Sequence, residues 1–230
     1  MIGSRFLLAG LLSASAAFAG LLGPTPYLSF ADSPFSGGSF SYFHLENFED
    51  GALNTPGVTA NAGIVLAPSI NTDSVDGDDG AIDGSGQGGH SWFSNASTTS
   101  FQFTFNAALL GALPTHVGIV WTDIGQSVTG GLGTGAVTFE AFDENGLSLG
   151  IVGPTVLGDG SVGGGTAEDR FFGATNASGI SSITISVNSA DWEVDHLQYG
   201  LAADSIPEPS TVVLCSLSLL GLALRRFMMK

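Results

Sequence analysis

An all-β fold, a single β-sandwich of jelly-roll-like form, is predicted for residues 20–203 from three features of the sequence. Several short segments alternate apolar with polar residues, which is the period of a strand with one buried face. Glycine, proline and asparagine, which favour turns, separate these segments. No segment of this body shows an apolar stripe at helical spacing. Short strands at this density, with 34 glycines in the chain, are typical of one sandwich domain.

Strands are expected in five segments that are alternating or continuously apolar: 101–105, 117–121, 137–141, 183–187 and 192–200. The alternation is clearest where Phe101, Phe103 and Phe105 are separated by single polar residues. The continuous run from Val117 to Trp121 predicts a central strand with both faces covered. Asn145-Gly146 lies between two apolar segments and predicts a hairpin turn.

The first 19 residues have the order of a secretory signal peptide. Arg5 is the only charge, residues 6–12 are apolar, and Ala17-Phe18-Ala19 forms a cleavage site of small residues. The apolar stretch is shorter than the about 20 residues that a membrane-spanning helix needs. The sequence therefore predicts export across a membrane, and a buried N-terminal helix is the alternative.

Residues 204–230 form a second targeting segment. Pro207-Glu208-Pro209 favours extended backbone, because proline lacks an amide hydrogen and disfavours helix before it. Residues 211–224 contain no charge and predict a short transmembrane helix, which Arg225-Arg226 follows. A positive cluster after a membrane span stays cytoplasmic, so the body is expected outside.

This tail resembles the PEP-CTERM sorting signal, in which a Pro-Glu-Pro motif, a transmembrane run and a basic end follow one another. The resemblance implies transient processing by an exosortase, a cysteine transpeptidase of the inner membrane of Gram-negative bacteria. Pro207, Glu208 and Pro209 match the recognition element, and Arg225 and Arg226 match the retention element. The body would then reach the cell surface or the extracellular matrix. An ordinary membrane anchor that is never cut is the alternative.

The charge distribution excludes nucleic acid as a partner. The chain has 5 Lys and Arg residues against 21 Asp and Glu residues, and Arg170 is the only Lys or Arg between residues 20 and 203. Such an acidic body repels phosphate backbones and attracts divalent cations. Cys215, the only cysteine, lies in the apolar run of the tail, so the body is expected to depend on its core and on bound metal.

Two motifs near the ends of the body resemble the calcium-stabilised jelly-roll domains of lectins and carbohydrate-binding modules. The early motif is Asn47-Phe48-Glu49-Asp50-Gly51, and the late motif, the predicted last strand, runs from Trp192 to Gly200 with Asp195 between apolar residues. The resemblance implies a structural calcium shared by Glu49 and Asp195 on neighbouring strands. His196 departs from the pattern, because such domains often carry Asn or Asp at this place. Solvated acids at strand ends are the alternative.

The acidic, glycine-rich segment 73–83 is a second calcium candidate. Carboxylates with flexible glycines suit an ion that takes six to eight oxygen ligands. Asp76 and Asp78 fit the first ligand positions of an EF-hand loop, but Gly80 and Ala81 break that pattern. A solvated acidic loop without metal is the alternative.

Two residues are candidates for contact with a glycan. Trp92 could stack on a sugar ring, although a place in the core is the competing interpretation. Arg170 could clamp an acidic sugar, and a local salt bridge is its simpler role.

The sequence offers no positive sign of catalysis. Gly131 to Gly135 lacks the lysine of a phosphate-binding loop, no nucleophile elbow occurs, and the four histidines lack the spacing of zinc ligands. PEP-CTERM proteins are associated with exopolysaccharide and biofilm matrices. We therefore expect a non-enzymatic, calcium-stabilised protein of the cell surface or exopolysaccharide matrix that binds a glycan. A secreted polysaccharide-active hydrolase and a purely structural coat protein stay open as alternatives.

Overall fold

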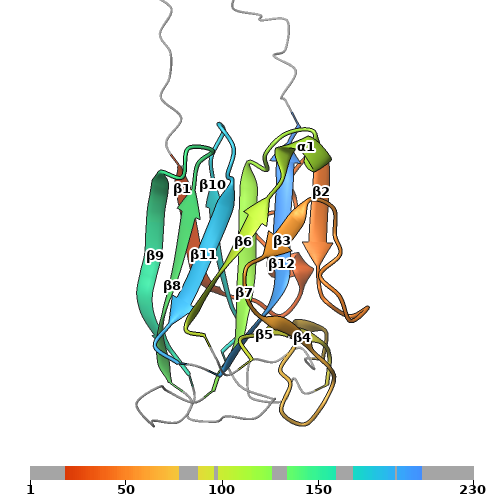
Figure 1. Ribbon diagram of the computed structural model, residues 1–230, viewed down its shortest axis with the longest axis vertical. Coiled ribbons are helices and arrows are strands. Elements are labelled where there is room, and N and C mark those ends of the chain that lie inside the picture. Colours follow the sequence, from red (N-terminus) through yellow and green to blue (C-terminus); the bar gives the residue numbers. More distant parts are fainter. Residues whose placement is uncertain are drawn as a thin grey trace, which may run out of the picture.

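Two antiparallel β-sheets pack face to face in the computed structural model, which describes residues 19–77, 88–95, 98–125, 134–158, 168–189 and 191–203 (Figure 1). The predicted all-β sandwich is confirmed. None of the helices in these ranges is both long and apolar enough to cross a membrane. The predicted signal peptide and sorting tail lie outside the described residues.

The larger sheet has seven strands in the order β1-β10-β7-β12-β5-β4, and β2 also pairs with β12. Its strands are β1 (Gly20–Pro26), β2 (Phe40–Glu46), β4 (Ile64–Leu66), β5 (Ser91–Phe93), β7 (His116–Ile124), β10 (Arg170–Thr175) and β12 (Trp192–Ala202). One side of β12 pairs with β7, while its other side pairs with β5 near its start and with β2 further along. The predicted last strand is thus central to this sheet.

The smaller sheet has five strands in the order β3-β6-β11-β8-β9. Its strands are β3 (Val58–Ala60), β6 (Ser100–Phe105), β8 (Gly135–Phe142), β9 (Ser148–Leu157) and β11 (Ser182–Val187). The helical elements are short: α1 (Ala107–Leu110) and two 3-10 turns at Phe30–Asp32 and Val75–Gly77. The predicted hairpin joins β8 to β9, and Gly146 adopts a φ of 74° there, which suits glycine.

The alternating segments bury the faces that their sequences predict. Phe101, Phe103 and Phe105 of β6 are buried between the sheets, and alternate residues of β8 are buried in the same way. Each such side chain contributes about 1.5–3 kcal/mol when it leaves water. In β7, Ile119 and Trp121 belong to this main core, whereas Val120 faces the other way.

A second apolar cluster covers the outer face of the seven-stranded sheet. It consists of Tyr27, Phe35, Val75, Val120 and Phe171. Because Val75 is one of its members, this cluster holds the segment 73–77 against the sheet. That segment carries the acidic residues of the candidate site.

Candidate functional site

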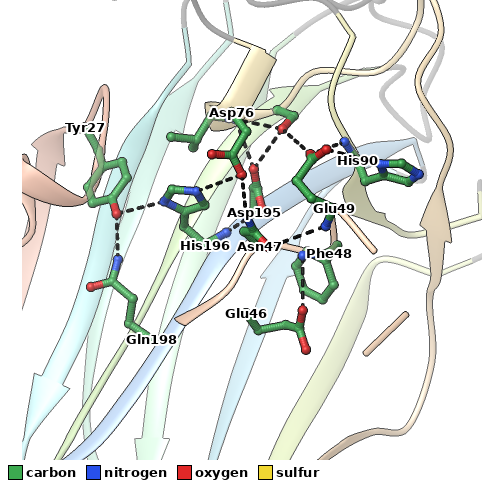
Figure 2. Close-up of polar contacts among 12 residues, drawn as sticks. Tyr27, Glu46, Asn47, Phe48, Glu49, Asp76, His90, Asp195, His196 and Gln198 are labelled. Atoms are coloured by element: carbon green, nitrogen blue, oxygen red, sulfur yellow. Dashed lines mark hydrogen bonds and ion pairs between the residues drawn. The ribbon is translucent and has the colours of Figure 1, made fainter. Parts of the chain in front are cut away.

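The loop after β2 is fixed by a buried carboxylate. Glu46 is 3% exposed, and its two oxygens accept hydrogen bonds from the backbone N–H groups of Phe48, Asn54 and Thr55. Phe48 adopts a φ of 56° while its ring is buried in the main core. These contacts set the direction of the loop, so that Asn47 and Glu49 face the segment 73–77 (Figure 2).

A bulge in β12 brings two consecutive side chains to one side of the sheet. The register with β7 shifts between Asp195 and Gln198, and His196 adopts a φ of 45°. Side chains of a regular strand alternate between faces, but Asp195 and His196 both contact the segment 74–76. Bulges that redirect side chains in this way are frequent beside functional sites.

The segment 73–77 lies across β12 and is held by two of its carboxylates. Glu193 accepts the N–H of Asp73 at 3.0 Å. Asp195 accepts the Ser74 hydroxyl and the Val75 N–H, both at 3.0 Å through the same oxygen. Glu193 and Asp195 are two residues apart and therefore share a face of the strand.

Asp76, Asp195 and His196 converge at this place: one ligand atom from each lies within 4.8 Å of the others. His196 Nε2 is 3.3 Å from Asp76 Oδ2, to which Asn47 Nδ2 donates at 2.8 Å (Figure 2). The other ring nitrogen of His196 is 2.9 Å from the Tyr27 hydroxyl. His196 and Asp195 are buried, whereas the Asp76 side chain is 38% exposed, so the cluster opens to solvent on one side.

Glu49 adjoins this cluster through Ser74. Its Oε1 atom is 3.4 Å from Ser74 Oγ, and its Oε2 atom is 3.3 Å from His90 Nδ1. The one hydroxyl hydrogen of Ser74 cannot serve Glu49 and Asp195 together, so the second contact needs a proton on the carboxyl group or a cation. A Cβ at Gly89 would lie 2.7 Å from Glu49 Oε1, which means that only glycine lets the backbone approach so closely.

The electrostatics of the cluster follow from burial. Burial raises the pKa of Asp195 from an ordinary 3.8 to about 7, because a buried carboxylate loses its hydration. Burial alone would lower the pKa of His196, but its hydrogen bond to Asp76 and the nearby carboxylates outweigh this effect and raise it. The same hydrogen bond lowers the pKa of Asp76 against the opposing effect of burial. Without a cation, the cluster therefore favours a proton on Asp195 and on His196.

The donor set fits a hard cation. Carboxylate and hydroxyl oxygens come from Glu49, Ser74, Asp76 and Asp195, and calcium takes six to eight such ligands with water completing the set. His196 donates to Asp76 and to this extent acts as a positioning group. Asp78, the other predicted ligand, lies outside the described residues.

The two predicted glycan contacts lie elsewhere. Trp92 is 8% exposed and packs against Phe48 and Phe103, while its Nε1 donates to the Ala62 carbonyl. The ring has no free face for a sugar, so its place in the core corrects the stacking hypothesis. Arg170 at the start of β10 donates through Nη1 to the Asp169 carbonyl at 2.8 Å. The sorting residues Pro207, Glu208, Pro209, Arg225 and Arg226 lie outside the described residues.

Sequence reasoning missed a second group of buried acids on the same face of the sheet. Asp123 of β7 lies directly opposite Glu193 of β12, and they are 4% and 2% exposed. Burial, then the charges of Glu168 and Glu193, raise the pKa of Asp123 to about 10, and burial raises that of Glu193 to about 8. Glu193 could have been found from its two-residue spacing to Asp195. The pairing of β7 with β12, which brings Asp123 beside it, has no signal in the sequence.

No family model matches the chain, and a search of curated proteins finds no match. Among solved structures, a xylan-binding domain of carbohydrate-binding module family 22, formerly called an x6b domain, is 16% identical with a TM-score of 0.37. The match covers 74% of this chain and 99% of that domain. The CBM22-2 xylan-binding domain from Paenibacillus barcinonensis Xyn10C is 12% identical with a TM-score of 0.35, over 69% and 99% of the two chains.

A third similar structure is the C-terminal family 22 carbohydrate-binding module of Clostridium thermocellum Xyn10B. It is 15% identical with a TM-score of 0.29, over 74% of this chain and 99% of that module. None of these TM-scores reaches 0.5, so the likeness carries no inference about the ligand of this chain.

Proposed function

We propose that this chain is a non-enzymatic protein of the cell surface or exopolysaccharide matrix whose β-sandwich is stabilised by calcium and binds a glycan. The observation that carries the calcium proposal is the convergence of Asp76 and Asp195, with His196 beside them, from segments about 120 residues apart. Glu49 joins them from a third segment. Carboxylates that approach one another so closely repel, and a divalent cation turns this repulsion into attraction.

Calcium at this place would supply stability and no chemistry. It would tie the loop after β2 and the segment 73–77 to the bulge of β12. The body lacks a cysteine pair, so a metal clip would take the role that disulfides have in many exported domains. Glu49, Asp76 and Asp195 are the proposed ligands, and His196 orients Asp76.

The proposed location and processing rest on the two ends of the sequence. The signal peptide of residues 1–19 supports export, and the tail with Pro207-Glu208-Pro209 and Arg225-Arg226 supports exosortase processing at the inner membrane. Export to the matrix makes a glycan the partner that the protein would meet. The strongly acidic body supports the absence of nucleic-acid partners.

Thermal unfolding with and without calcium tests the central part of this proposal. Calcium at about 100 times its Kd should stabilise the folded chain by about 2.7 kcal/mol. Asp195→Asn should lose this response, whereas the matched control Glu140→Gln on β8 in the other sheet should keep it. A response to zinc but not to calcium, abolished in His196→Asn, would instead make His196 a ligand of a transition metal.

A polysaccharide hydrolase is the second candidate, and one observation favours it. Asp123 and Glu193 are opposed carboxyl groups at a pocket. A glycosidase uses such a pair, one protonated and one ionised, and the raised pKa values suit the protonated member. However, Glu193 Oε2 already accepts hydrogen bonds from Ser91 Oγ and the Asp73 N–H. Release of reducing ends from a polysaccharide by the wild type but not by Asp123→Asn would replace the non-enzymatic proposal.

A further inference from the structure

A polar cavity lies beside the second group of acids. Its volume is about 350 Å³, and its lining includes the acids Asp123, Asp191 and Glu193 and the apolar residues Leu66 and Phe93. Ser69 and Asn71 also line it. This volume is at the lower end of the range for small-molecule sites, which suits one sugar ring better than a long chain.

The register of the strands places three of the lining residues side by side. Glu193 on β12 lies directly opposite Asp123 on β7 and also opposite Phe93 on β5. Directly opposed residues of antiparallel strands put their side chains on the same face. The three therefore form a row of two carboxylates and one aromatic ring across the sheet. Phe93 is only partly buried, unlike Trp92 beside it.

A buried oxygen of Asp123 gives independent evidence that the cavity binds a ligand. The residue is only 4% exposed, and its Oδ1 atom has no hydrogen-bond partner in the described part of the chain. A buried polar atom without a partner costs about 1–3 kcal/mol or more when charged. Because Asp123 lines the cavity, a donor from a ligand bound there would find an acceptor at this residue.

The charge around the cavity favours a cationic donor. Asp73, Glu168 and Asp191 all act electrostatically on Asp123 in addition to Glu193. Arg170 is the only Lys or Arg among the described residues, and it is absent from the lining of the cavity. A bound ammonium group would be attracted by these carboxylates and would donate up to three hydrogen bonds.

A metal ion fits this cavity less well than an organic cation. The only His, Cys, Asp or Glu ligand atoms in the described ranges that gather in threes within 4.8 Å are those of Asp76, Asp195 and His196. The acids of the cavity are therefore spaced more widely than a metal centre requires. A ring with an apolar face would contact Phe93 and Leu66, while its polar groups face the acids.

We propose that this cavity binds one amino sugar, a pyranose that carries a free ammonium group, within a polysaccharide. The inference rests on the proposed glycan binding and names the class of glycan. Asp123 receives the ammonium group and releases its own proton as the cation binds, because a neighbouring positive charge favours the ionised carboxylate. Asp191 and Glu193 ionise more readily beside the same cation, and Phe93 stacks against the C–H face of the ring. N-acetylation of the same sugar removes the charge and two of the donors.

Calorimetric titration of the full chain in calcium at about pH 6, where the sugar amine is protonated, tests this assignment with two matched ligands. They are β-1,4-linked glucosamine oligomers and their N-acetylated forms. The wild type should bind the free-amine oligomer at least about tenfold more tightly, because a charge-assisted hydrogen bond is lost on acetylation. Asp123→Asn should weaken binding of the free-amine oligomer by about tenfold or more, and Phe93→Ala should weaken it as well. Glu140→Gln should leave it unchanged.

Two results would overturn the assignment. One is equal affinity for the two oligomers, and the other is unchanged binding in both Asp123→Asn and Asp191→Asn. The calcium-induced rise in Tm, measured on the same variants, separates this inference from the proposed function. If calcium still raises the Tm but the chain does not prefer the free-amine oligomer, the amino-sugar assignment fails and the calcium proposal stands. If Asp123→Asn loses the calcium response, the cavity is part of the metal site, and this result would also overturn the amino-sugar assignment.

Discussion

Replacing Asp195 by asparagine should have opposite effects on the metal-free and the calcium-bound protein. The folded chain holds a proton on Asp195 up to about pH 7, whereas the unfolded chain releases it near 3.8. Between these values the folded state binds more protons, so the free energy of unfolding of metal-free protein falls as pH rises. A difference of about three pKa units corresponds to about 4 kcal/mol.

His196 changes stability in the same direction. Its pKa is raised in the folded chain, so its stabilising effect is complete below pH 6.5 and is lost as pH rises through the higher folded value. Asp76 has a lowered pKa, so its stabilising contribution is already present above 3.8 and is lost only in acid. Metal-free wild type should therefore be more stable at about pH 5 than at about pH 8, by about 3 kcal/mol from Asp195 alone, because the rest of the effect falls between the unfolded value of 3.8 and pH 5.

Calcium should reverse this trend because it binds the deprotonated carboxylates. About 2–4 °C in Tm corresponds to 1 kcal/mol in a domain of this size. The Tm of metal-free wild type should thus fall by about 5–10 °C between about pH 5 and 8, and calcium should restore most of this loss. Asp195→Asn should show a smaller fall and a higher metal-free Tm at pH 8, but no gain from calcium.

Differential scanning calorimetry at matched pH values measures the Tm of wild type and of Asp195→Asn, each in chelator and in calcium. Glu140→Gln, in the other sheet, should behave as wild type. Identical Tm–pH profiles for wild type and Asp195→Asn, with neither responding to calcium, would refute both the buried-carboxylate argument and the metal site.

The other predictions concern separate parts of the chain. Glu49→Gln should lower the calcium affinity by about tenfold while leaving the metal-free Tm nearly unchanged, because Glu49 is partly exposed; a calcium titration followed by calorimetry measures this. Trp92→Ala should destabilise the fold by about 3–5 kcal/mol, as for other buried aromatic rings; chemical denaturation measures the loss, and a value below about 1 kcal/mol would contradict a core position. Replacing Pro207-Glu208-Pro209 by alanines should leave full-length protein in the inner membrane, and mass spectrometry of the mature product decides this, since equal mature masses for both chains would contradict the sorting proposal.

Much of the fold could be predicted because strand formation leaves a local pattern. The alternation of Phe101, Phe103 and Phe105, the apolar run from Val117 and the Asn145-Gly146 turn each depend on residues adjacent in sequence. The short strands β3, β4 and β5 have three residues each, too few for a period to be visible. Trp92 illustrates the limit: the segment around it shows no strand period, but packing against Phe48 and Phe103 buries it.

The sequence by itself determined the all-β class, the acidic body with one Arg and the motifs that contain Glu49 and Asp195. It did so because composition, periodicity and short motifs are properties of neighbouring residues. Only the tertiary structure decided which acids meet. Contacts between residues about 40–120 positions apart create the site: the bulge at His196, the cluster around Val75 that holds segment 73–77 and the pairing of β7 with β12. Contacts over such separations depend on strand order and register, which the spacing of residues along a chain does not encode locally.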